Sequence, residues 1–262
     1  MSIPISKTIE AIKPSGIRKF FDIVSEMKDA ISLGVGEPDF DTPWHIRDEG
    51  IYAFEQGKTF YTSNSGLKVL RVEISNYIKR KQKISYCPDG EILVTVGGSE
   101  AIDIGLRAMI NEGDEVIIPQ PSYVSYEPCA LLAGAKPVIL NLKAENDFRL
   151  TPEELEEAIT EKTKVLILPY PNNPTGAIMD KNDLEKIAEV IKKHDIFVMS
   201  DEIYSELTYN GEHVSIASLA GMRERTLLIN GFSKAYAMTG WRLGYACGPK
   251  EIIKQMTKIH QF

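Results

Sequence analysis

Lys234 stands at a place in the sequence where a lysine could do covalent chemistry. It follows the apolar run at residues 226–229, which is long enough for a buried strand and too short for a helix. Burial at the rim of a sheet lowers the pKa of an amine, and an unprotonated amine can form an imine with a carbonyl compound. The alternative interpretation is a solvated surface lysine. The residues around Lys234 are needed to distinguish the two interpretations.

A carboxylate and a phenol follow another apolar run. Asp201 comes directly after residues 196–200, and Tyr204 lies three residues further on. Burial of an aspartate is costly unless the side chain is paired or hydrogen-bonded. Asp201 is therefore either a turn or helix cap or a fixed negative charge that faces a ring nitrogen of a ligand. Tyr204 is either a core or rim tyrosine or a second group in the same crevice.

Two turns could contact a ligand through small or amide-bearing residues. Residues 97–99, Gly-Gly-Ser, join a predicted strand to a predicted helix, and free backbone N–H groups at such a helix start favour an anion such as phosphate. Arg242 could add a bidentate phosphate contact, although a surface ion pair is the simpler interpretation. Residues 171–176 form a rigid proline-rich turn in which Asn173 could present its amide to a ligand.

The elements that would position these residues alternate between strands and helices. Strands are predicted at residues 91–96, 115–119, 136–140, 164–168, 196–200, 226–229 and 243–247, with helices in most of the intervals and a last helix from Pro249. This alternation predicts an α/β fold with a mainly parallel sheet and helices on both faces. Ligands of such folds lie beyond the carboxyl ends of the strands. The residues that follow strand ends should therefore converge on one crevice: Gly98, Ser99, Tyr123, Asn173, Asp201, Tyr204, Ser233 and Lys234.

The first 82 residues are less regular. Residues 1–14 are polar and proline-punctuated and predict an arm. Helical spacing of apolar residues predicts a helix at 16–28, and a short strand at 30–33 leads into a glycine-containing loop at 34–40 that lacks the dinucleotide-binding spacing. Further helices are predicted at 43–56 and 67–82, the second with Leu67, Leu70, Ile74 and Ile78 on one face.

Composition excludes several function classes. The chain has 262 residues, 43% of them hydrophobic, and a formal net charge of -7, which argues against a nucleic-acid surface. The three cysteines are scattered and the four histidines show no metal-ligand spacing, so we expect free thiols and no metal site. The N-terminus has no long apolar segment that would predict a signal peptide or membrane span. We therefore expect a cytoplasmic protein.

Together and in this order, the motifs resemble the pyridoxal-phosphate-dependent aminotransferases of fold type I, class I/II. The matching segments lie at residues 33–40, 61–67, 96–101, 121–123, 171–176, 200–204 and 231–244, and they span nearly the whole chain. The combination of Asn-Asn-Pro-Thr-Gly, Asp-Glu-Ile-Tyr and Ser-Lys-Ala-Tyr-Ala-Met-Thr-Gly-Trp-Arg is highly specific for this family.

The resemblance implies roles around the cofactor ring. Lys234 would be the lysine that forms the imine with pyridoxal phosphate and then the base that moves the substrate proton. Asp201 would pair with the pyridinium nitrogen and keep the ring an electron sink. Tyr204 and Asn173 would hydrogen-bond to the ring hydroxyl oxygen, and Tyr123 would stack on the ring.

The resemblance also implies roles around the phosphate and the substrate. The phosphate would be held by Gly98, Ser99, Arg242 and Ser233. Tyr61 would reach the phosphate of a neighbouring subunit, which implies a homodimer. Gly36 would lie near the substrate carboxylate.

A domain organisation follows from the same resemblance. Residues 1–45 would form an N-terminal arm and part of a small domain, and residues 46–262 the large domain that binds pyridoxal phosphate. Family members also carry a C-terminal segment that completes the small domain and supplies an arginine for the substrate carboxylate. Since the sequence ends at Phe262, inside the helix expected after the large-domain sheet, we expect that segment to be absent from this chain.

Three hypotheses of function remain. The first is an aminotransferase that acts on an L-amino acid and a 2-oxo acid. The second is a pyridoxal-phosphate-dependent carbon–sulfur lyase of the same fold, which shares most of these motifs. The third is a catalytically silent module that binds the cofactor or dimerises. Transcription regulators of this fold are disfavoured, because they carry an N-terminal DNA-binding domain and the sequence has no room for one before residue 15.

Overall fold

The structure, a computed structural model, describes residues 3–14, 27 and 36–262. The helix predicted at residues 16–28 lies almost entirely outside the described residues, as does all of the strand predicted at 30–33.

A seven-stranded sheet forms the centre of the molecule, in the order β1-β7-β6-β5-β4-β2-β3. The strands are β1 (Ile92–Thr95), β2 (Glu115–Gln120), β3 (Lys136–Asn141), β4 (Thr163–Leu168), β5 (Phe197–Asp201), β6 (Thr226–Gly231) and β7 (Gly244–Cys247). Only β7 runs antiparallel to its neighbours β1 and β6, and the remaining pairs are parallel. The predicted mainly parallel sheet is confirmed, and each of the seven strands predicted between residues 91 and 247 lies within a few residues of an observed one.

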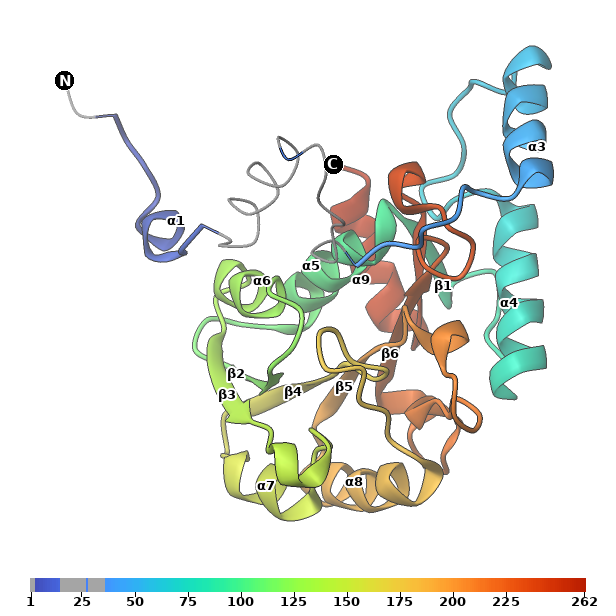
Figure 1. Cartoon of the computed structure of the whole chain (residues 1–262). Helices are drawn as coiled ribbons and strands as arrows, with labels where there is room; N and C mark the ends of the chain where they lie inside the picture. Colours follow the sequence, from blue (N-terminus) through green and yellow to red (C-terminus); the bar gives the residue numbers. More distant parts are fainter. Residues whose placement is uncertain (1–2, 15–26, 28–35) are drawn as a thin grey trace.

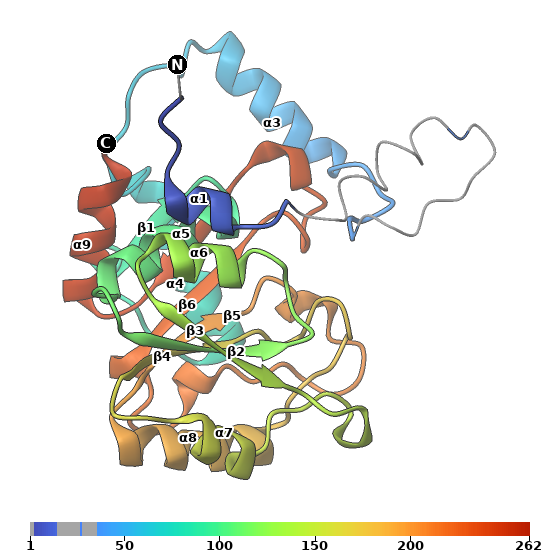
Figure 2. The ribbon, with the colours of Figure 1, turned by 90° about the vertical axis from the view of Figure 1, so that its left-hand side faces the viewer.

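Helices cover both faces of this sheet, as the alternation of elements predicts. The described α-helices are α1 (Lys7–Ala11), α3 (Trp44–Glu55), α4 (Lys68–Gln82), α5 (Gly97–Met109), α6 (Tyr126–Leu132), α7 (Pro152–Ala158), α8 (Lys181–His194) and α9 (Lys250–His260). Figures 1 and 2 show α5, α6 and α9 on one face and α7 and α8 on the opposite face. None of the described helices is both long and apolar enough to cross a bilayer.

Every strand except β3 contributes side chains to apolar cores on both faces, because successive residues point to opposite faces, whereas the edge strand β3 contributes to one core. On β5, Met199 packs into the core beneath α5 and α9, whereas Val198 packs into the core above α8. A capping box begins α7, with Thr151 accepting from the Glu154 N–H and Glu154 accepting from the Thr151 N–H.

Helix α4 lies beside the end of the sheet at β1, and Figure 1 shows α3 beyond one end of α4. Helix α4 buries Ile74 and Ile78 as predicted, but Leu67 precedes it and is exposed, and the polar side chains Arg71 and Gln82 are buried instead. The buried face is therefore rotated relative to the predicted one, because these two polar side chains find hydrogen-bond acceptors inside the fold.

Candidate active site

The carboxyl edge of the sheet gathers the residues that were predicted to converge. Asp201 ends β5, Asn173 lies in the turn after β4, and Lys234 follows β6. Helix α5 begins directly at Gly97, without the extra turn expected from the sequence, so Gly98 and Ser99 belong to its first turn. Because these strands run in the same direction, all of these turns lie at one edge.

Lys234 lies in this edge as a partly buried amine. Its Nζ donates a hydrogen bond to the carbonyl oxygen of Gly36 and lies 5.6 Å from the centre of the Tyr204 ring. Burial lowers the pKa of Lys234; the negative charge of Glu37 opposes this change, and the positive charge of Arg242 adds to it. The amine therefore loses its proton more readily than an ordinary lysine.

Asp201 is buried, with 7% of its surface exposed. The Tyr126 hydroxyl donates to its Oδ2 at 2.7 Å, and the Ile203 N–H donates to its Oδ1 at 3.2 Å. Burial raises the pKa of Asp201 in spite of these two hydrogen bonds, and the charge of Glu202 adds to the rise. Within the described part of the chain, no Lys, Arg or His forms an ion pair with this carboxylate.

Tyr126 is a site residue that the motifs did not single out. It begins α6, three residues after Tyr123, and its N–H donates to the Tyr123 carbonyl oxygen at 3.3 Å, which closes the turn before the helix. Their rings pack edge to face, 5.6 Å between centres and at 85°. This spacing was the available signal, but only the tertiary structure places the hydroxyl against Asp201.

Tyr204 and Asn173 lie close to each other. Burial raises the pKa of Tyr204, the charges of Asp201 and Tyr123 add to the rise, and the Asn173 side chain opposes it. The Tyr123 hydroxyl in turn lies 3.5 Å from Ser99 Oγ at the start of α5. The phenol groups of Tyr204 and Tyr123 and the Asn173 amide thus lie in the same region as Asp201 and the start of α5.

At the start of α5, the Arg242 guanidinium lies next to the backbone N–H groups of the first helical turn. Gly97 has φ +75°, and a Cβ atom there would lie 2.5 Å from Nη2 of Arg242. The guanidinium therefore lies directly against the turn, with Nη1 donating to the Thr239 carbonyl oxygen at 3.1 Å. An arginine beside a helix N-terminus is a favourable arrangement for a phosphate group.

The remaining predicted site residues differ in their surroundings. Ser233 is buried next to Lys234, and a Cβ atom on Gly36 would lie 4.0 Å from the Tyr204 hydroxyl. Tyr61 is fully exposed and has no hydrogen-bond partner among the described residues, so the fold of the single chain does not bring it to the other site residues. The described residues also hold no cluster of His, Cys, Asp and Glu that could bind a metal ion.

Comparison with known proteins places this site in a family. The family described as aminotransferase class I and II matches residues 28–262. The chain belongs to this family. The predicted family resemblance is confirmed, and members of the family use pyridoxal phosphate.

Individual relatives agree with the family assignment. The chain is 52% identical to the putative aminotransferase YugH of Bacillus subtilis, over 100% of this chain and 68% of the relative. It is 49% identical to an aspartate aminotransferase of Pyrococcus abyssi, over 98% of this chain and 67% of the relative. The solved structure of the Thermus thermophilus aspartate aminotransferase with maleate superposes with a TM-score of 0.94 at 41% identity, covering 99% of this chain and 68% of that one.

These coverages mean that the chain spans about two thirds of the length of the relatives it matches. The matched portion contains the whole seven-stranded sheet and the edge that carries Lys234 and Asp201. The predicted fold, that of the fold type I enzymes, is confirmed by these structural neighbours.

Proposed function

We propose that this chain binds pyridoxal phosphate at the carboxyl edge of the sheet and moves an amino group between an L-amino acid and a 2-oxo acid. One observation carries the proposal: the edge holds a partly buried amine, Lys234, 5.6 Å from the centre of the Tyr204 ring, together with a buried carboxylate, Asp201, that has no ion-pair partner among the described residues. Two titratable groups whose environments shift their pKa values away from the ordinary range are typical of an active site.

The residues at the edge fit this cofactor. Asp201 is a buried carboxylate without a cationic partner in the described chain, and a protonated ring nitrogen would supply one. Gly98, Ser99, Ser233 and Arg242 would hold the phosphate, since α5 begins there and the guanidinium lies against it. Tyr123 would stack on the ring, and Tyr204 with Asn173 would donate to its hydroxyl oxygen.

Each of these residues has a chemical task when the cofactor is bound. Pyridoxal phosphate supplies an aldehyde that captures amines and a ring that withdraws electrons from the substrate carbon. Lys234, as a neutral amine, would hold the cofactor covalently with loss of water, and the same amine would serve as the base for the proton on the substrate carbon. Asp201 would hold the proton on the ring nitrogen, and the Tyr204 hydroxyl would stabilise negative charge on the ring oxygen. Gly36, whose carbonyl oxygen Lys234 contacts, would lie next to the substrate carboxylate.

Mixing the cofactor-loaded chain with a panel of amino acids, aspartate among them, and with 2-oxoglutarate tests this function. We expect the visible absorbance of the bound cofactor to change and the amino group to appear on the 2-oxo acid. Release of ammonia and a thiol instead would identify a carbon–sulfur lyase. Bound cofactor that no amino acid converts would identify a catalytically silent binding module.

Lys234→Ala tests the covalent role of the lysine. Borohydride should fix the cofactor to the unaltered chain and not to the variant, because the variant lacks the only amine placed against Tyr204 among the described residues. Mass spectrometry of the reduced protein measures the attachment. Lys79→Ala, on the exposed side of α4, is the control and should behave as the unaltered chain. A reduced bond that survives in Lys234→Ala would contradict the assignment.

We further infer a homodimer in which Tyr61 reaches the phosphate of the neighbouring subunit. The full exposure of Tyr61 in the protomer supports this arrangement. The division into residues 1–45 and 46–262 and the cytoplasmic location stay predictions; three free cysteines support a reducing compartment.

A further inference from the structure

Glu202, the residue after Asp201, is a buried carboxylate held by four side chains. Only 1% of its surface is exposed. Gln82 Nε2 donates to it at 2.8 Å, Ser200 Oγ at 2.9 Å and Ser215 Oγ at 2.6 Å. The fourth contact joins His213 Nε2 to Glu202 Oε2 at 2.7 Å, and since a carboxylate accepts, that nitrogen carries the proton.

These donors come from separate parts of the chain. Gln82 ends α4, Ser200 belongs to β5, and His213 and Ser215 lie in the segment that leads to β6. The backbone N–H of Glu202 also donates to the carbonyl oxygen of Ile229 on β6 at 2.8 Å. One side chain therefore links a helix, the end of a central strand and a long loop.

The position of Glu202 in the chain gives this cluster its importance. Asp201 precedes it and Tyr204 follows two residues later, and the proposed function assigns both to the cofactor. Ser200 and Asp201 point to opposite faces of the sheet because they are neighbours on a strand. The Glu202 cluster thus holds the strand end from the face opposite to the one where Tyr126 contacts Asp201.

Burial of a carboxylate is costly, and a packed apolar residue would often give equal or greater stability at such a position. The charge also lies near other groups, since Glu202 raises the pKa of Asp201, of the buried tyrosines Tyr86 and Tyr245, and of Cys247. A costly charge at the junction of three segments suggests a task beyond filling the core.

We propose that Glu202 is a positioning residue, whose four hydrogen bonds fix the end of β5 so that Asp201 and Tyr204 keep their orientation toward the cofactor. The proposal rests on the proposed function, because it assigns Asp201 and Tyr204 to the cofactor. Glu202 itself contacts neither of the proposed cofactor-binding side chains through a hydrogen bond among the described residues.

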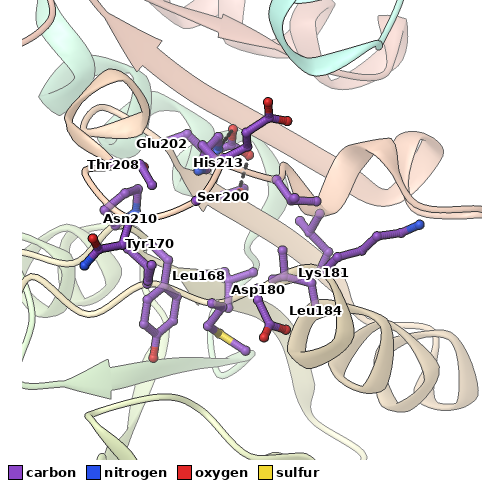
Figure 3. Close-up of a pocket in the computed structure, with 17 residues that line it drawn as sticks. Leu168, Tyr170, Asp180, Lys181, Leu184, Ser200, Glu202, Thr208, Asn210 and His213 are labelled. Atoms are coloured by element: carbon purple, nitrogen blue, oxygen red, sulfur yellow. Dashed lines mark hydrogen bonds and ion pairs between the residues drawn. The ribbon is translucent and has the colours of Figure 1, made fainter.

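A cavity borders two donors of this cluster, His213 and Ser200. It has a volume of about 280 Å³ and is lined by apolar side chains that include Leu168, Met179 and Leu184. Figure 3 shows His213, Glu202 and Ser200 together at one side of this cavity. The His213 side chain is 14% exposed, so a small molecule in the cavity could take the place of its imidazole.

The experiment removes this imidazole and then returns it. In His213→Ala, we expect the dissociation constant of pyridoxal phosphate to rise about tenfold. The loss of a hydrogen bond to a charged group changes an equilibrium constant by about that factor or more. Free imidazole at millimolar concentration should restore the affinity. His194→Ala is the matched control: its ring contacts Glu156 at 2.8 Å on α7, away from the site, and neither the substitution nor imidazole should change cofactor affinity.

Two substitutions at Glu202 provide an independent measurement. Glu202→Gln should keep most of the affinity, because Oε1 of Gln82 has no hydrogen-bond partner and a rotated Gln82 amide can accept from the new N–H. Glu202→Ala should lose affinity and shift the pH at which the visible band of the bound cofactor titrates. Glu115→Ala removes another buried carboxylate, at the start of β2, and should lower only the melting temperature.

The outcomes separate the two proposals. If the unaltered chain binds no pyridoxal phosphate, the proposed function is wrong. If the unaltered chain binds it and His213→Ala binds it equally well, with or without imidazole, Glu202 does not position the site although the function stands. If Glu202→Ala does not fold, the His213→Ala measurement still decides the question.

Discussion

Asp201 shows at the scale of one residue how a functional group can lower stability. Its raised pKa means that the folded chain binds the proton more tightly than the unfolded chain does. The stability that this proton provides is complete below the ordinary aspartate pKa and is lost as the pH rises through the raised value. At neutral pH the buried charge therefore lowers the stability of the chain without cofactor.

Asp201→Asn should remove this effect. We expect the cofactor-free variant to melt at a higher temperature than the unaltered chain at neutral pH, with a gain in unfolding free energy on the order of 1 kcal/mol. The gain should shrink as the pH falls, because Asp201 then becomes protonated in the unaltered chain as well. Thermal unfolding followed by circular dichroism over a series of pH values measures it.

The same substitution should slow the proposed reaction although it stabilises the chain without cofactor. Asp201→Asn should still bind pyridoxal phosphate, but proton removal from an amino acid should slow severely because the amide does not hold the ring-nitrogen proton by charge. Stopped-flow absorbance measures that rate. An unchanged rate would remove Asp201 from its proposed role, and an unchanged melting temperature at neutral pH would show that the buried charge is not costly.

The contact between β7 and the start of α5 matters at the scale of elements. A Cβ atom on Gly244 would lie 2.5 Å from the backbone carbon of Gly97 and 2.6 Å from the nitrogen of Gly98. Backbone touches backbone there, so no side-chain rotation could relieve the contact. This close approach brings Arg242, two residues before Gly244, against the turn that we propose holds the phosphate.

Gly244→Ala should push these two elements apart. We expect a loss of about 1–3 kcal/mol in unfolding free energy, as for other overpacked positions, together with weaker binding of pyridoxal phosphate. Denaturant unfolding and absorbance titration measure the two effects. Gly240→Ala, where a Cβ atom would meet nothing within 4 Å, is the control for a nearby glycine. If the two variants have the same unfolding free energy and cofactor affinity, the contact between Gly244 and the start of α5 is not tight.

At the scale of the whole molecule, large apolar side chains are exposed on α3 and on the loop after it. They are Trp44, Ile51, Tyr52, Phe54, Phe60 and Tyr61. Figures 1 and 2 show α3 projecting from the layered body. Such a surface is typical of one that another chain or segment covers, which agrees with the proposed homodimer.

Tyr61→Phe tests whether a second protomer completes the site. Because Tyr61 has no partner among the described residues of its own protomer, a change in cofactor affinity would require its hydroxyl to act across a dimer. We expect a dimer in sedimentation velocity and a dissociation constant about tenfold higher in the variant. Tyr209→Phe, another exposed tyrosine, should have no effect. If the unaltered chain is a monomer and Tyr61→Phe binds pyridoxal phosphate with unchanged affinity, Tyr61 does not complete the site of a second subunit.

The sequence by itself determined the order of the elements, the mainly parallel sheet, and the family. These depend on local patterns: apolar runs, caps such as the one at Thr151, and motifs that are contiguous in the chain. It also placed Lys234, Asp201 and Asn173 after strands, and a parallel sheet brings such positions to one edge whatever the details of packing.

Only the tertiary structure decided which groups surround those residues. The Tyr126 hydroxyl reaches Asp201 across 75 positions of the chain, and Gln82 reaches Glu202 across 120. The apolar pattern assigned Leu67 to the buried face of α4 and passed over Gln82, because periodicity detects hydrophobic burial and cannot detect a buried amide that a distant carboxylate satisfies. The shifts in the pKa values of Lys234 and Asp201 have the same origin, since burial depends on the packing of the complete fold.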